Sequence, residues 1–163
     1  MSFGEIMTVI ETVILFLGLA ATIWTLRRTH NENKAMSTIE LIIHQRSDDA
    51  LNDAINLTTK LARDLRDFSD LSDYLKNVQS KEYQAIIKVL NFREFVAVGI
   101  NNDVIDEQIY KDAYYSTILR DWNYLKTTVN FIRNSKTGYP TAFQDFEKLA
   151  QRWEKKPLKR KVK

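Results

Sequence analysis

Two apolar segments of the sequence are interrupted by polar side chains that could meet in the folded protein. Asn91 and Glu94 lie in the first segment, and Arg120 lies beside Trp122 in the second. If the segments are helices packed antiparallel, Asn91 and Glu94 meet Arg120 in a buried polar network, because buried charges must be paired. Such a network mainly fixes the register of the two helices. The alternative is a small-ligand pocket lined by Glu94 and Arg120.

Other chemistry-bearing patterns are sparse. The stretch 101–107 (Asn-Asn-Asp-Val-Ile-Asp-Glu) is rich in oxygen ligands but lacks the spacing of an EF-hand, so it predicts a turn and a helix cap. No P-loop, G-x-S-x-G or H-E-x-x-H motif occurs, and the chain has no cysteine and two histidines. We therefore expect no catalytic, cofactor-binding or metal site, and a protein that is not an enzyme.

The C-terminal segment 155–163 is strongly basic. It carries six of the 24 basic residues and no acidic one, whereas the rest of the chain has 18 basic and 21 acidic residues. Each lysine or arginine near an anionic leaflet adds about 1 kcal/mol of attraction. Three interpretations stay open: a solvated tail, a lipid contact and, ranked last, a nucleic-acid contact. The predicted lipid contacts are Lys155, Lys156, Lys159, Arg160, Lys161 and Lys163.

The N-terminal segment 6–26 is an almost unbroken apolar run, closed by Arg27 and Arg28. As a helix it is about 31 Å long, which matches the hydrocarbon core of a bilayer. A signal peptide would carry basic residues before the run and a small-residue cleavage site after it, and the sequence shows neither. We expect a single-pass anchor in the inner membrane. By the positive-inside rule its N-terminus faces out and the rest is cytosolic.

Glu11 is the one charged residue within this run. A carboxylate in a membrane span is costly and often functional. Three interpretations stay open: the side chain reaches outward to the interface, it supports self-association of the helix, or it lines an ion or proton path. Gly18, Ala21 and Thr22 form a small-residue patch that permits close helix packing, and so a homo-oligomer.

The rest of the sequence predicts helices. No proline or glycine occurs between Gly18 and Gly99, which favours long helices there. The anchor helix is predicted to continue to about Arg46. Ser47 or Asp48 then caps a second helix. The segment 68–80 is the predicted connector to the next element.

A third helix is predicted to open at Ser80 or Lys81. Because its apolar residues lie on more than one face, we expect it at the centre of the fold. Asp106 is predicted to cap a long fourth helix, which the segment 138–140 (Gly-Tyr-Pro) breaks. Thr141 is predicted to start the last helix.

The fold class that follows is all-α, with an N-terminal transmembrane helix continuing into a cytosolic bundle of about four further helices. We divide the chain into an anchor (1–28), a juxtamembrane helix (29–46), a helical bundle domain (47–154) and a basic tail (155–163).

Four sequence blocks carry a resemblance to a known family. They are Leu-Asn-Phe-Arg-Glu-Phe at 90–95, Val-Gly-Ile with Ile-Asp-Glu at 98–107, Leu-Arg-Asp-Trp at 119–122, and the aromatic pattern at 143–153. Together with the N-terminal span, their order and spacing resemble a family of small single-span bacterial and phage membrane proteins, catalogued only as a domain of unknown function. The resemblance implies a membrane-anchored helical domain. It transfers no catalytic residue.

These observations predict a membrane-anchored, cytosol-facing helical module that holds a protein partner, or its own copies, at the membrane. The phage members of the family suggest host interference as a setting. Two other functions stay open: a membrane-tethered sensor of a small ligand, and a nucleic-acid tether acting through the basic tail.

Overall fold

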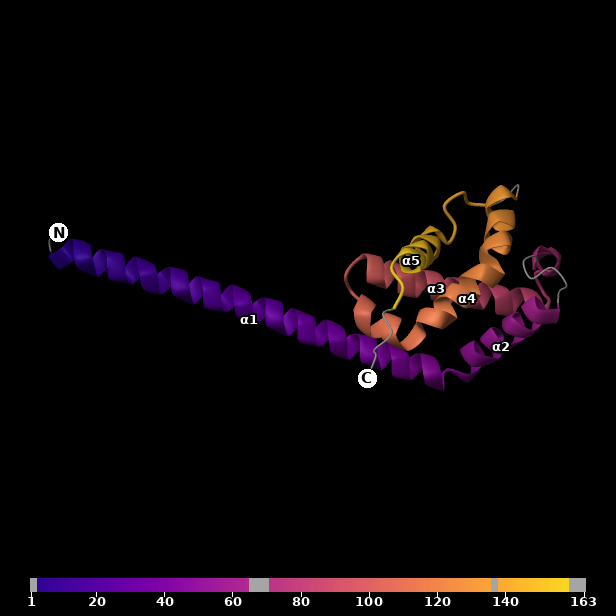
Figure 1. The fold of residues 1–163 in the computed structure, drawn as a ribbon, viewed down its shortest axis with the longest axis horizontal. Helices are drawn as coiled ribbons and strands as arrows, with labels where there is room; N and C mark the ends of the chain where they lie inside the picture. The colour runs from indigo at the N-terminus through magenta and orange to yellow at the C-terminus, as the bar shows by residue number, and fades with distance from the viewer. Residues whose placement is uncertain (1–2, 65–70, 136–137, 159–163) are drawn as a thin grey trace.

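The computed structural model of the chain describes residues 3–64, 71–135 and 138–158, apart from the side chains of residues 5, 6 and 9. Over these residues the chain is all-α, as predicted, and four further α-helices follow the N-terminal one (Figure 1). The elements are α1 (Phe3–Ser47), α2 (Asp49–Asp64), the short 3-10 helix η1 (Ser72–Lys76), α3 (Lys81–Asn101), α4 (Glu107–Asn134) and α5 (Gln144–Lys155).

Helix α1 is a single 45-residue rod whose N-terminal part projects away from the bundle (Figure 1). The predicted continuation of the anchor helix to about Arg46 is confirmed, since α1 ends at Ser47. From Ile10 onward α1 is long and apolar enough to cross a membrane, judged by length and composition. Every side chain from Ile10 to Leu26 is exposed, so this part packs against none of the other described elements.

Helix α3 is the centre of the bundle, as its apolar pattern predicted. It packs against α2, α4, α5 and η1. Its buried side chains repeat at helical spacing, and they include Ile86, Val89, Leu90, Val96 and Ile100. The largest apolar side chains that close over this core come from the other helices: Tyr110, Ile118 and Leu125 of α4, and Phe146 and Trp153 of α5.

Two predicted helix caps, Asp48 and Asp106, are confirmed, and Ser80 caps the third helix, which begins at Lys81 as one of the two predicted starts. The Asp48 carboxylate accepts a hydrogen bond from the backbone N of Leu51 at 2.9 Å, the Ser80 hydroxyl from that of Tyr83 at 3.1 Å, and the Asp106 carboxylate from that of Ile109 at 3.0 Å. Each satisfies one of the amides that a helix start leaves without a partner.

Two local predictions need correction. The last helix begins at Gln144 and not at Thr141, because Phe143 adopts a left-handed conformation (φ 57°) that keeps the preceding turn outside the helix. The predicted connector 68–80 contains η1, which follows the buried side chain of Leu71. The first residues of that connector lie outside the described residues.

The C-terminal third of α1 is part of the bundle. The buried Thr38 hydroxyl accepts a hydrogen bond from the backbone N of Asp106 at 2.8 Å and donates one to the carbonyl of Lys34 at 2.7 Å. About two turns further along α1, the Gln45 side-chain oxygen accepts a hydrogen bond from the Tyr110 hydroxyl at 2.8 Å. These bonds attach α1 to the start of α4, so the rod and the bundle are held together by buried polar contacts.

The Thr38 contact yields a stability prediction. Thr38→Val keeps the shape of the side chain but removes the acceptor for the Asp106 amide, so the free energy of unfolding should fall by about 1–2 kcal/mol. Chemical denaturation of the full chain in detergent measures this change. Thr29→Val, at an exposed threonine of the same helix, should change it by less than about 0.5 kcal/mol. Equal effects of both substitutions would contradict the contact.

Candidate functional site

One carboxylate joins two arginines between α3 and α4. Asp121 Oδ2 accepts hydrogen bonds from Nε and Nη2 of Arg93, at 3.0 and 2.8 Å. Asp121 Oδ1 accepts from Nε and Nη2 of Arg120, at 3.1 and 2.9 Å. Arg93 is completely buried and Asp121 is 4% exposed, whereas the Arg120 side chain is 37% exposed. The cluster therefore runs from the core to the surface.

The electrostatics of this cluster are unbalanced. Two guanidinium groups share one carboxylate, and arginine stays charged at any ordinary pH, so the cluster carries a net positive charge. Arg93 Nη1 is buried and has no hydrogen-bond partner among the described residues. Beside it, burial raises the pKa of the Tyr110 hydroxyl, an effect that the nearby Arg93 charge opposes. Tyr110 therefore remains a proton donor to Gln45.

Glu94 belongs to a different contact. Its carboxylate accepts hydrogen bonds from the backbone N of Asp145 at 3.3 Å and of Phe146 at 2.7 Å, at the first turn of α5. A negative charge is favourable there because the amides of a helix start point outward and the helix dipole is positive at that end. Glu94 thus does for α5 what a local cap does elsewhere, and it fixes α5 on α3.

The predicted network of Asn91, Glu94, Arg120 and Trp122 is wrong in its pairing. Glu94 bonds α5 and Arg120 bonds Asp121, so these two described residues do not pair. Asn91 is exposed. Trp122 is buried, and its ring meets the Phe146 ring edge-on at 5.3 Å between centroids. Glu94 and Trp122 share one neighbour, Phe146: Glu94 bonds its backbone N and Trp122 packs against its ring.

A buried polar contact between α3 and α4 does exist, but it joins Arg93 and Asp121, which are the sequence neighbours of the predicted Glu94 and Arg120. A finer reading of the sequence could have found them. Arg93 continues the spacing of Ile86, Val89 and Leu90, and Asp121 falls three residues after Ile118, so both positions belong to buried faces.

The turn residues 101–107 serve the docking of α5 as well as the start of α4. The Glu107 carboxylate accepts hydrogen bonds from Nε of Arg152 at 3.0 Å and from Nε1 of Trp153 at 2.7 Å. Arg152 Nη1 also donates to the Asn101 side chain at 2.9 Å. These oxygen atoms are engaged by α5, in agreement with the structural role predicted for this stretch.

The basic tail is described only at its start. Lys155 and Lys156 are exposed at the end of α5, and the Lys156 carbonyl accepts a hydrogen bond from Lys111 Nζ at 2.6 Å. The other predicted lipid contacts, Lys159, Arg160, Lys161 and Lys163, lie outside the described residues. The lipid contact therefore stays a prediction.

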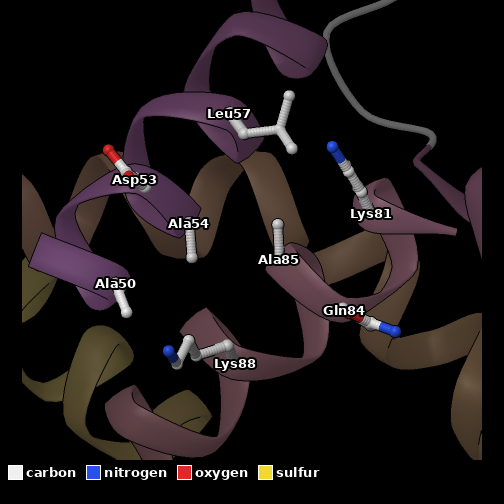
Figure 2. Close-up of a pocket in the computed structure, with 8 residues that line it drawn as sticks. All are labelled: Ala50, Asp53, Ala54, Leu57, Lys81, Gln84, Ala85 and Lys88. Atoms are coloured by element: carbon white, nitrogen blue, oxygen red, sulfur yellow. The ribbon is translucent and has the colours of Figure 1, made fainter.

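An open groove of about 340 Å³ runs between α2 and α3 (Figure 2). Ala54 and Ala85 form part of its floor, and their small side chains leave the space open. Lysines and other polar residues stand on the rim. The lining residues are Ala50, Asp53, Ala54 and Leu57 of α2 and Lys81, Gln84, Ala85 and Lys88 of α3.

A comparison with protein families matches residues 12–153 of the chain to the family described as Domain of unknown function DUF4760. The chain belongs to the DUF4760 family. The match covers α1 from residue 12 onward and the described helices of the bundle as far as residue 153 of α5, and it confirms the resemblance to an unknown-function family. Comparison with curated proteins and with solved structures found no match. The description of DUF4760 assigns no activity, so the geometry of the chain carries the functional argument.

The shared carboxylate yields the second prediction. Asp121→Ala leaves Arg93 buried without a counter-charge, so the free energy of unfolding should fall by about 3–5 kcal/mol. Denaturation of the full chain in detergent measures it. Asp112→Ala, at an exposed aspartate of α4, should cost less than about 1 kcal/mol. A double-mutant cycle on Arg93 and Asp121 should show coupling well above about 0.5 kcal/mol, and a cycle on Glu94 and Arg120 should not. The reverse result would restore the pairing inferred from the sequence.

Proposed function

We propose that the chain is a membrane-anchored helical module that holds a protein partner on the cytosolic side of the inner membrane. The observation that carries this proposal is the groove between α2 and α3. It is open to solvent, apolar at its floor and polar at its rim, which are the properties of a surface that receives an amphipathic helix (Figure 2).

The charges of the groove favour one kind of partner. Lys81, Gln84 and Lys88 are three to four residues apart on α3, so they form one stripe along the rim. Asp53 stands across from them on α2. These three charged residues, Lys81, Lys88 and Asp53, form no ion pair with any described residue. We therefore propose a partner helix with small apolar side chains toward the floor and acidic side chains toward Lys81 and Lys88.

The anchor part of the proposal rests on α1. A helix whose apolar side chains are all exposed from Ile10 to Leu26 is unfavourable in water, and insertion into lipid removes that cost. Arg27 and Arg28 follow at once, which supports the cytosolic placement of the bundle. Host interference by a phage or prophage member of the family stays a prediction that these features accommodate.

The other candidate functions are weaker. A ligand pocket between Glu94 and Arg120 is not formed, because each of these residues is bonded elsewhere. The nucleic-acid tether depends on the basic tail, most of which lies outside the described residues. Neither the Glu94–Arg120 pocket nor the tail therefore has an observation comparable to the groove.

The third prediction tests the groove. A photo-crosslinking amino acid at Gln84, on the groove, should capture a protein in native membranes, whereas the same group at the exposed Gln151 of α5 should not. The charge reversal Lys88→Glu should lower the capture about tenfold, because it repels an acidic partner. Mass spectrometry of the crosslinked peptide should show an acidic, amphipathic segment.

Lys126→Glu is the matched control for that experiment, since it makes the same charge change on an exposed part of α4. Capture should survive it. The proposal fails if Gln84 and Gln151 capture the same proteins, or if Lys88→Glu leaves capture unchanged.

The fourth prediction concerns orientation. Because the basic residues that flank the span follow it, a reporter fused after Lys163 should behave as cytosolic: a fluorescent protein should fluoresce, and an alkaline phosphatase should be inactive. Active phosphatase would place the bundle on the other side of the membrane.

A further inference from the structure

A second cavity, with a different character, lies between α2 and α4. Its volume is about 460 Å³, within the range of small-molecule sites. Unlike the α2–α3 groove, it is lined mainly by polar side chains. Those that could contact a ligand are Asn56, Thr59, Lys60, Arg63 and Asp64 of α2 and Arg120 of α4.

The lining of this cavity is cationic. Lys60, Arg63 and Arg120 converge on it from two helices, and Asp64 is the one carboxylate among the described residues that line it. Lys60 and Arg63 are exposed and form no ion pair with any other described residue. Like charges held in one cavity repel each other unless an anion lies between them. The cavity therefore favours a negatively charged ligand.

Arg120 connects the cavity to the buried cluster. Its guanidinium is held on one side by Asp121, whose other oxygen is occupied by Arg93. The carboxylate therefore cannot neutralise both arginines, and the excess positive charge reaches the surface at Arg120. Two hydrogen bonds to Asp121 fix the plane of the Arg120 guanidinium group. Little side-chain freedom is therefore lost when its remaining N–H groups bind a ligand.

We propose that this cavity binds a small molecule that carries a phosphate or diphosphate group. Guanidinium groups bind phosphate oxygens through paired N–H donors, and lysine adds a point charge. Asn56 and Thr59 supply an amide and a hydroxyl donor beside them. The site is independent of the partner groove, which lies between a different pair of helices.

The position of the cavity favours a dissolved ligand over a lipid headgroup. Helix α2 continues away from the N-terminal end of α1 (Figure 1). Between Arg27 and Ser47 the rod alone adds about 30 Å beyond the apolar run. For a chain anchored through residues 6–26, the phosphates of its own membrane are therefore out of reach of Lys60 and Arg63.

Isothermal titration of the full chain in detergent with pyrophosphate at low salt tests the site. Wild-type protein should bind, and Lys60→Gln and Arg63→Gln should each weaken binding about tenfold or more, because each removes a charge-assisted contact. Both residues are exposed, so the fold should persist, as circular dichroism checks. Lys126→Gln removes the same charge from α4 outside the cavity and should leave the affinity within about twofold.

Three outcomes overturn the proposal. The cationic site is wrong if wild type binds neither pyrophosphate nor short-chain phosphatidic acid, or if Lys126→Gln weakens binding as much as Arg63→Gln does. A parallel titration with short-chain phosphatidic acid distinguishes the source of the phosphate. Binding of that lipid without binding of pyrophosphate would overturn the assignment to a dissolved ligand.

Discussion

The carboxylate of Asp121 holds the bundle in register. It is the counter-charge of a fully buried arginine, Arg93, and α3 cannot slide along α4 without separating the two. An uncompensated charge in that place would cost several kcal/mol, more than most single apolar contacts contribute. Apolar packing makes the helices associate. The ion pair favours the register of α3 and α4 in which the two charges meet.

The other helices are attached around this pair through neighbouring positions. Glu94, the residue after Arg93, accepts a hydrogen bond from the first turn of α5. Tyr110, near the start of α4, donates one to Gln45 of α1. Both attachments use polar groups that would be unsatisfied if the helix were displaced by a turn. The position of each helix therefore depends on the register set at the centre, and the surface between α2 and its neighbours follows from it.

Much of the fold was predictable because the information for it is local. Apolar spacing and the short polar residues Asp48, Ser80 and Asp106 determine where helices run and begin, and the structure confirms them. The buried pair was missed because it depends on two helices at once. Neighbouring residues such as 93 and 94 point about 100° apart, and helical spacing assigns Arg93 and Asp121 to buried faces. That these two side chains meet depends on the relative position of α3 and α4, which no local pattern contains. The late start of α5 has the same origin, since Glu94 replaces a cap from the segment before the helix.

The unbroken course of α1 fixes more than an attachment point. Between Leu26 and Lys34, where contact with the bundle begins, about 12 Å of bare helix separates the apolar run from the domain. A helix of this kind resists both bending and twisting. In a chain anchored through residues 6–26 it would set both the height of the bundle above the bilayer and the direction in which the bundle faces. Each residue of helix in that interval contributes about 1.5 Å of height and about 100° of rotation. The number of residues between Leu26 and Lys34 therefore fixes the angle of the bundle about the axis of α1, and in an anchored chain it would decide which side of the domain neighbouring membrane proteins meet.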